Sequence, residues 1–364
     1  MTACDGCLRR VALVALLAPY VERGPRDRHK LREMLSLSDM RLIEALAGDR
    51  QGSIQHAHAS FDPARARERL RAASMHAVCR HDPSYPPRML EADDAPAVLH
   101  VAGNVERVAV LADRDVPAVA VVGARRAGAD GLEIARGLGR GLAAAGVTVI
   151  SGMALGIDAA AHAGALEVGG PTITVLAGGA DVAYPASKRS LHRELVRTQA
   201  AVSEMPPGCK PFRWCFPARN RTIAGLASMT IVVEATERSG SLITADLAQE
   251  LGRAVGAVPG PVTGTRCAGS NALLRDGAFV IRDAQDALDE ALGIGVATAL
   301  GGRRPEELSA ALRSLLLRVE DGRDTVSALA ETPAEAEHAI AGLAELELLG
   351  FVRRGMGGHY VRLP

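Results

Sequence analysis

Several short loops of this chain combine glycine with arginine, a pairing that suits the binding of phosphate groups. The clearest runs from Gly123 to Gly128, with Arg125 and Arg126 at its centre. It lies between an apolar run and a helical stretch, where a dinucleotide-binding domain carries its glycine-rich turn. Arg125, however, stands where that turn needs its second glycine. Paired arginines at a helix N-terminus suit a phosphate that lies across the loop; the alternative is a solvated turn.

A second segment, from Lys210 to Arg221, joins cations with aromatic rings and contains no acidic residue. Its cations are Lys210, Arg213, Arg219 and Arg221, and its rings are Phe212, Trp214 and Phe216. Cationic side chains that follow a phosphate backbone, with rings on which bases stack, are typical of a surface for single-stranded nucleic acid. The alternative is a loop whose rings pack into the core or into a subunit contact.

Three other loops that follow apolar runs offer further contacts for an anion, and the second of them also reads as an ordinary turn before a helix. The first contains Gly152, and glycine permits close approach to the backbone. The second ends near two cations, and the third presents hydroxyl groups and amides. In all, the predicted DNA or phosphate contacts are Gly123, Arg125, Arg126, Gly152, Lys188, Arg189, Lys210, Phe212, Phe216, Arg219, Asn220, Arg221, Ser239, Gly240 and Ser241.

No group of residues forms a convincing active site. Asp158 and His162 are four residues apart at the start of a predicted helix and share one of its faces. An acid–base pair or a metal site is conceivable there, but a helix-capping aspartate and a packed histidine are favoured. No Walker loop and no nucleophile triad stands on a suitable turn. We therefore predict no catalytic residue, no cofactor and no enzymatic activity.

The six cysteines are too sparse and scattered for a disulfide scaffold, which favours a reducing cytoplasm. Cys4 and Cys7 form a C-x-x-C pair, but a zinc site would need two more ligands. Cys79 and His81 are the nearest candidates, and their spacing matches no familiar zinc finger. The favoured interpretation is a frayed N-terminus with two free thiols, so no metal is predicted.

The elements that must position these loops follow from the hydrophobic pattern. Apolar runs of strand length span 97–101, 118–122, 147–150, 172–176, 200–203, 230–234, 254–258 and 278–281, and helical stretches between them span 131–145, 159–168, 188–197 and 244–251. Continuous apolar strands that alternate with helices indicate a mostly parallel sheet covered on both faces. The predicted fold is therefore α/β with a Rossmann-like core, and ligands bind beyond the carboxyl ends of such strands.

Four regions are expected along the chain: a helical N-terminal region at 1–77, the Rossmann-like core at 78–290, a Gly-rich linker at 291–304, and a winged-helix-like domain at 305–364. In the last of these, amphipathic helices precede a predicted hairpin. A winged helix often binds DNA, but the helices here are rich in glutamate, so a protein-contact role is favoured.

The composition is that of a soluble globular protein, with 48% hydrophobic and 23% charged residues in 364. No apolar run is long enough to cross a bilayer, and no secretory signal is evident. The formal net charge is zero. Local patches, rather than bulk charge, must therefore support any binding to nucleic acid.

Taken together, these loops resemble the DNA-processing protein A (DprA/Smf) family. The matching stretches are Asp82–Pro87, Gly123–Arg125, Ser151–His162, Ser203–Gly208, Phe216–Leu226, Val232–Ala235, Arg238–Ala245, Ala257–Gly260 and Gly269–Asn271. The likeness spans about residues 78 to 290. It implies a non-catalytic recombination mediator that binds single-stranded DNA, forms homodimers, and helps to load the RecA recombinase, in some bacteria during natural transformation.

By position, the resemblance implies that Arg125 contacts phosphate, that Phe216 to Arg221 line a groove, and that the Ser239–Ser241 turn completes an anion pocket. Three positions depart from the family pattern: Ala124 replaces its usual serine, Leu155 its arginine, and Ala186 its lysine. The rival interpretations are a nucleotide phosphoribohydrolase on a related fold, whose glycine-rich motif with a glutamate is missing here, and a nucleotide-sensing module.

Overall fold

The core of the protein is one nine-stranded sheet in the computed structural model, which describes residues 3–24, 27–293, 308–330, 332–349, 351–355 and 358–362. The strand order is β1-β2-β6-β5-β4-β3-β7-β8-β9. The bounds are β1 Met75–Cys79, β2 Val98–Gly103, β3 Ala118–Val122, β4 Thr148–Ser151, β5 Thr172–Leu176, β6 Ala200–Ser203, β7 Met229–Val232, β8 Ala254–Ala257 and β9 Phe279–Val280. Strands β3 to β9 run parallel, and β1 and β2 add an antiparallel edge.

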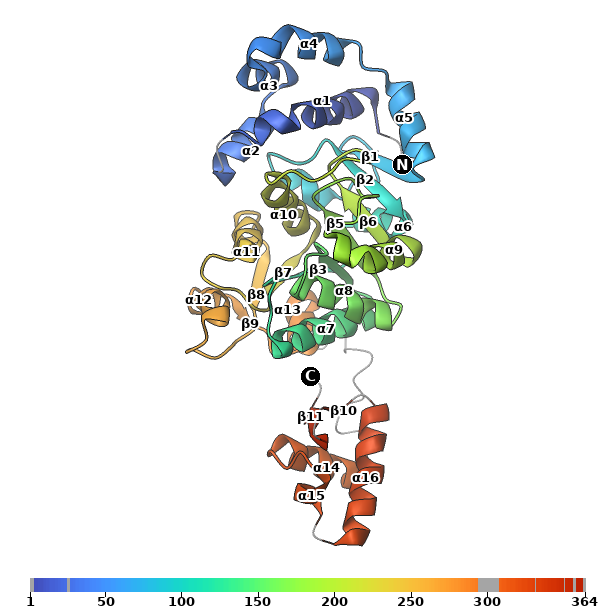
Figure 1. Cartoon of the computed structure of the whole chain (residues 1–364), viewed down its shortest axis with the longest axis vertical. Coiled ribbons are helices and arrows are strands. Elements are labelled where there is room, and N and C mark those ends of the chain that lie inside the picture. The colour runs from blue at the N-terminus through green and yellow to red at the C-terminus, as the bar shows by residue number, and fades with distance from the viewer. Residues whose placement is uncertain are drawn as a thin grey trace.

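Helices cover both faces of this sheet, as the predicted fold class requires (Figure 1). Those of the core are α6 Glu106–Ala109, α7 Ala129–Ala144, α8 Ile157–Glu167, α9 Arg189–Thr198, α10 Cys215–Leu226, α11 Gly240–Glu250, α12 Ala268–Arg275 and α13 Ala284–Leu292. Short 3-10 turns lie at Gly48–Arg50, Pro87–Glu91, Val110–Ala112, Ala186–Lys188 and Thr265–Cys267.

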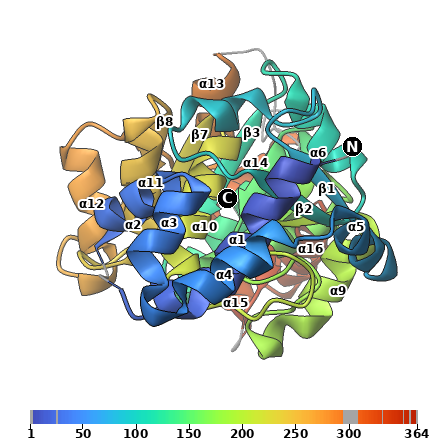
Figure 2. The same cartoon turned by 90° about the horizontal axis from the view of Figure 1, so that it is seen from above.

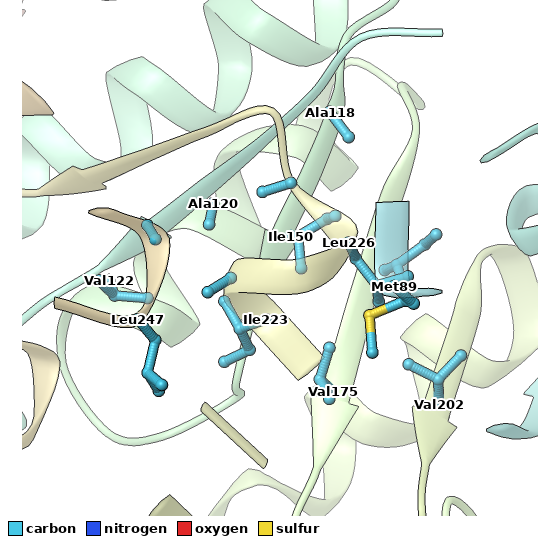
Figure 3. Packing of buried hydrophobic residues seen from close by; sticks show 14 of the residues in the cluster. Met89, Ala118, Ala120, Val122, Ile150, Val175, Val202, Ile223, Leu226 and Leu247 are labelled. Carbon is cyan, nitrogen blue, oxygen red and sulfur yellow. The ribbon is translucent and has the colours of Figure 1, made fainter. Parts of the chain in front are cut away.

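The alternation of side chains along β3 shows how the two faces are filled. Ala118, Ala120 and Val122 belong to the cluster on one face, where α10 packs through Ile223 and Leu226 (Figure 3). The intervening valines of β3 point to the opposite face, which α7, α8 and α13 cover. Because both faces are buried, every residue of the strand is apolar, and this explains the continuous run in the sequence.

The N-terminal region is helical, as predicted, with α1 Asp5–Val21, α2 Arg28–Ser36, α3 Asp39–Leu46, α4 Gln51–Ala59 and α5 Pro63–Ala72. Figure 2 shows α1 to α4 on the viewer's side of the sheet and α5 beside strand β1, and α2 contacts α10 directly. The described residues from Ala3 onward are ordered, because Cys4 already caps α1 and Cys7 is buried. The prediction of a frayed N-terminus is therefore wrong.

Two core elements differ from the prediction. Residues 75–77 were predicted as helix, but they begin strand β1, which pairs with β2 at the antiparallel edge. The segment expected to be a basic loop becomes helix α10 from Cys215 onward, and this helix buries nine of its residues. The sequence did not reveal this burial, because two of the buried residues are the arginines Arg219 and Arg221.

The C-terminal part has its own small core and follows the predicted order of helices and a hairpin. Its elements are α14 Ala310–Glu320, α15 Val326–Leu329, α16 Pro333–Leu348, β10 Val352–Arg354 and β11 Tyr360–Arg362. Strands β10 and β11 pair antiparallel. Its assignment to the winged-helix class stays a prediction. The predicted linker at 291–304 lies mostly outside the described residues.

Candidate nucleic-acid interface

The carboxyl ends of the parallel strands form one edge of the sheet, and the strand order reverses there between β3 and β7. From β3 the chain builds β4, β5 and β6 outward on one side, whereas β7, β8 and β9 extend the other side. A crevice opens at such a switch point. The loop from Gly123 to Gly128 follows β3, and the loop that contains Arg238 follows β7, so both lie at this switch point.

Arg125, Phe216 and Tyr184 meet above this edge, although they come from three separate segments. The Arg125 guanidinium lies 5.5 Å from the centroid of the Phe216 ring, a cation–π contact. The Phe216 and Tyr184 rings lie 5.5 Å apart at an interplanar angle of 53°. Arg125 and Tyr184 are exposed, and Phe216 is half-buried. The arrangement presents a positive charge beside two ring surfaces.

Tyr184 was not among the predicted contacts. The signal that would have found it is an aromatic residue in the glycine-containing loop that follows strand β5, in a chain where aromatic residues make up only 3%.

The N-terminus of α7 is not free to bind an anion, in contrast to the expectation for the loop after β3. The buried Glu234 carboxylate accepts a hydrogen bond from the Gly128 amide at 2.8 Å. The chain therefore supplies its own negative charge to this helix terminus. Arg125 and Arg126 are both exposed, so the phosphate contact assigned to this loop rests on their side chains.

Gly123 makes room for packing rather than for a ligand. A Cβ atom on Gly123 would lie 2.7 Å from the Ile157 side chain and 3.0 Å from the Glu234 carbonyl oxygen. The loop is held from both sides, because the Ala124 amide donates to the Glu234 carbonyl and the Ile157 amide donates to the Ala124 carbonyl. Arg125 therefore projects from a fixed backbone.

Arg219 was predicted to contact DNA, and the structure buries it instead. Its guanidinium donates to the Val175 carbonyl at 3.0 Å and fills the space left by the missing side chain of Gly152. Burial lowers the pKa of Arg219, and the neighbouring Asp158 carboxylate opposes that shift. Arg219 and Gly152 thus support the loops from below, and neither surface is available to a phosphate.

Arg221 is likewise structural. It bonds Asp94 at 2.7 Å and Glu204 at 2.5 Å, and Arg32 of α2 reaches the same Asp94 at 3.2 Å. Burial pushes the pKa of Asp94 up, but the two arginines outweigh it and leave that pKa below its ordinary value. The prediction that Arg221 lines a binding groove is wrong, because the N–H groups of its guanidinium already donate to Asp94 and Glu204 inside the chain.

The rings of the basic segment divide between two roles. Trp214 donates its indole N–H to the Ala18 carbonyl of α1 at 3.1 Å, and Phe212 packs into the same cluster. The amide of Arg213 donates to Glu22, at the end of that helix, at 2.8 Å. Phe212 and Trp214 therefore dock the N-terminal helices, the alternative that the sequence left open. Phe216 also packs against this cluster, but it is the ring that contacts Arg125.

Three predicted cations lie exposed or half-exposed at the same edge. Lys188 and Arg189 begin α9 after strand β5, and Lys210 lies in the loop after β6. The Gly179 amide donates to the Cys209 carbonyl at 2.8 Å, which ties the loops after β5 and β6 together. These cations therefore lie in the segments that follow β5 and β6, at the same edge of the sheet as the loop of Arg125.

The Ser239–Ser241 turn is largely satisfied within the chain. Ser239 caps α11 by accepting from the Ser241 amide, and the two hydroxyl groups lie 2.7 Å apart. Ser241 is buried, whereas Gly240 is exposed. Asn220 donates to the Gly240 carbonyl at 3.2 Å, so it braces this turn against α10.

Asp158 and His162 do not form an acid–base pair. His162 is buried and its Nδ1 lies 2.8 Å from the Thr172 hydroxyl, which itself donates to the Val149 carbonyl. Asp158 accepts from the Ala154 amide at 3.3 Å, while Gly156 occupies the N-cap. The packed histidine is confirmed, and the capping role of the aspartate is wrong in detail.

A further group of side chains comes from the start of α1 and the end of β1, and the sequence did not predict that they would meet. Cys4, Cys7, Cys79 and His81 place one sulfur or nitrogen atom each within 4.8 Å of all the others.

Comparison with known proteins decides the family. The model of the family described as DNA recombination-mediator protein A matches residues 76–292, which is more than half of the chain. The chain belongs to the DNA recombination-mediator protein A family. The resemblance seen in the sequence is thereby confirmed, and so is the expectation of a DNA-binding mediator family rather than an enzyme family.

Relatives of this family extend the likeness. Protein Smf of Synechocystis sp. is 33% identical over 314 residues, covering 77% of this chain and 78% of that protein. A DNA processing protein of Mycobacterium tuberculosis is 47% identical over 172 residues, covering 47% of this chain. That match spans only 44% of the length of the relative.

Solved structures agree with the fold. DNA processing protein A from Streptococcus pneumoniae superposes with a TM-score of 0.63 at 31% identity, covering 80% of this chain and 99% of that one. A structure concerned with the single-stranded DNA binding mode of DNA processing protein A from Helicobacter pylori gives a TM-score of 0.53 at 26% identity, covering 59% and 94%. Among the residues that the structure describes, no helix is long and apolar enough to cross a membrane.

Proposed function

We propose that this protein is a recombination mediator that binds single-stranded DNA along the carboxyl edge of its sheet. The observation that carries the proposal is the cluster of Arg125, Phe216 and Tyr184, in which a guanidinium lies against a ring that neighbours a second ring. A cation that meets a phosphate beside rings that meet bases is the chemistry of single-strand recognition. The duplex hides its base faces, so the rings discriminate against it.

The binding surface is smaller than the sequence predicts. We propose that Arg125 and Arg126 contact phosphate, that Lys188, Arg189 and Lys210 add charge around them, and that Phe216 and Tyr184 stack on bases. Asn220 holds the Gly240 turn, which borders the crevice. Each phosphate contact adds to a binding term that falls with salt, and that term is modest here because Leu155 and Ala186 stand where the family pattern has an arginine and a lysine.

The mediator role extends this proposal to partners. We propose that the protein protects single strands in the cytoplasm and helps to load the RecA recombinase onto them, including strands taken up in natural transformation. We also propose that it acts as a homodimer. The acidic helices of the C-terminal part suit a protein contact better than a DNA contact, since several glutamates lie on them.

The direct test is competition between single and double strands. Fluorescence anisotropy of a labelled oligo-dT, competed with unlabelled oligo-dT or with duplex of equal length, should show the single strand displacing the label at a lower concentration. Equal competition by duplex, or no binding at low salt, would overturn the proposal. Incubation with AMP separates the enzyme alternative, because release of adenine would favour a nucleotide phosphoribohydrolase.

A further inference from the structure

The four side chains Cys4, Cys7, Cys79 and His81 form a cluster that the function proposed above does not use. Cys4 and Cys7 lie at the start of α1, Cys79 ends strand β1, and His81 follows two residues later. All four donor atoms lie within 4.8 Å of one another. Residues some 75 positions apart thus bring three thiols and one imidazole to a single point.

We infer that this cluster binds one zinc ion in a closed structural site. Three cysteines and one histidine are an established ligand set for structural zinc, and four protein ligands leave no open position for catalysis. The atoms are soft sulfur and borderline nitrogen donors, with no carboxylate among them, and this set selects zinc over magnesium or calcium.

The two separations of the His81 nitrogen from the Cys4 and Cys7 sulfurs fit a tetrahedral ion. Zinc–sulfur bonds of about 2.3 Å and zinc–nitrogen bonds of about 2.0–2.1 Å place sulfur and nitrogen ligands about 3.5 Å apart in a tetrahedron. The His81 Nδ1 atom lies 3.5 Å from the Cys4 sulfur and 3.4 Å from the Cys7 sulfur. Both separations match the edge of such a site.

The surroundings hold the ligands in place. The Cys4 amide donates to the Cys79 sulfur at 3.4 Å, an N–H···S bond that orients one ligand by the backbone of another. Arg67 of α5 donates to the Ala3 carbonyl at 3.1 Å and also pairs with Asp5, so it fixes the turn that carries the C-x-x-C pair. Cys7 and Cys79 are buried, whereas Cys4 and His81 are exposed, which leaves a path for the ion.

The position of the cluster indicates what the ion does. It joins the first turn of α1 to the edge strand β1, so it fastens the N-terminal helices to the core at the end opposite to the Trp214 contact with Ala18. Metal binding to a site of this kind contributes directly to the free energy of folding. The sequence motif alone did not predict it, because the second pair of ligands lies on a strand and in the turn after it rather than in a finger.

The test is the metal content of the full-length, untagged protein. We expect about one zinc per chain by atomic emission, and a Cys4→Ser/Cys7→Ser variant that retains almost none. The matched control is Cys209→Ser/Cys267→Ser, which also removes two cysteines but lies outside the cluster and should keep its zinc. If the first variant does not fold, His81→Ala, which removes the exposed ligand, serves as a second test. Replacement of a residue that only supports a ligand lowers metal affinity roughly tenfold or more, so loss of the ligand itself should lower zinc affinity by at least that factor.

Cobalt provides a readout independent of stability. Zinc-free protein titrated with Co²⁺ should develop sulfur-to-cobalt charge-transfer absorption and the intense visible bands of a tetrahedral ion, saturating at one ion per chain. The inference is overturned if the purified protein lacks zinc and Co²⁺ gives neither set of bands. A disulfide between two of the three cysteines, found by mass spectrometry in the freshly purified protein, would overturn it equally.

Discussion

At the scale of single residues, arginines that the sequence predicted to share one binding surface differ in their exposure to solvent. Arg125 is exposed and lies against Phe216, while Arg219 and Arg221, three and five residues beyond that ring, are buried. Residue type and spacing predicted a basic segment but not its depth, because helix α10 turns both arginines inward. The ion pairs of Arg221 involve residues far away in the chain, which no local pattern reveals.

Phe216 provides a residue-scale prediction about stacking. Phe216→Leu should weaken oligo-dT binding by about 1–3 kcal/mol, because it removes a ring surface for a base but no charge. Anisotropy titrations should show this loss with an unchanged dependence on salt. Trp214→Leu serves as the comparison: it should loosen the docking of α1 and lower stability. An equal loss of binding by the folded Trp214→Leu protein would argue against a specific role of Phe216.

His162 carries a prediction about pH. Burial lowers the pKa of this imidazole to about 3, from 6.5 in an ordinary environment. The unfolded chain therefore takes up a proton below pH 6.5 that the folded chain refuses, and stability is lost as the pH falls from there toward 3. The contribution is about 1.4 kcal/mol for each pH unit in that window.

Urea unfolding at pH 7 and pH 5 measures this effect. His162→Asn keeps a donor toward Thr172 but removes the titrating group, so its stability should fall less between the two pH values than that of the wild type. His100, whose pKa burial lowers to about 4, remains in both proteins and contributes equally. Identical pH dependence in the two proteins would contradict the assignment.

At the scale of elements, the sheet and its helices were largely predictable, because strands buried on both faces leave long apolar runs. Strands β3, β5 and β6 match their predicted bounds. Strand β1 and helix α10 were missed for physical reasons. The β1 strand is short and follows directly on an arginine-rich helix. In α10, Arg219 and Arg221 are buried at positions where apolar residues are expected; Arg219 bonds a carbonyl group and Arg221 pairs with Asp94 and Glu204.

The network around Arg221 gives an element-scale prediction. Arg221→Ala should destabilise the protein by about 3–5 kcal/mol, because it leaves the Asp94 and Glu204 carboxylates without their buried partner. Arg213→Ala is the matched control: its side chain is 81% exposed and lies 3.7 Å from Glu22, so the expected loss is below about 1 kcal/mol. Urea unfolding of both variants checks this. An Arg221→Ala protein as stable as the control would contradict the structural role of Arg221 and favour the original prediction of a DNA contact.

At the scale of the whole molecule, the N-terminal helices cover part of the carboxyl edge of the sheet, beside the loop after β6. Phe212 and Trp214 are used in this contact, whereas Arg125 and Arg126 in the loop after β3 stay exposed. The sequence showed that helices precede the core, but not that they pack on its ligand-binding edge, since that contact depends on single side chains of α1.

The proposed homodimer yields a prediction at the same scale. Strand β9 forms an edge of the sheet, and its Phe279 and Val280 are 44% and 54% exposed. An apolar edge strand offers unpaired backbone groups to a second copy. We predict that Phe279→Asp/Val280→Asp converts a dimer into a monomer in analytical ultracentrifugation. A wild-type protein that sediments as a monomer at micromolar concentration would refute the dimer, and an unchanged dimer in the variant would exclude this edge.

The salt dependence of oligo-dT binding tests the central claim most directly. Arg125→Ala removes one phosphate contact, so the slope of log affinity against log salt should become shallower by about 0.7. Arg197→Ala is the matched control, because it removes an exposed arginine at the far end of α9, paired with Glu194, and should leave slope and affinity unchanged. If the crevice at β3 and β7 binds DNA, only the Arg125 variant changes. Identical slopes in the wild type and both variants would contradict the proposed interface.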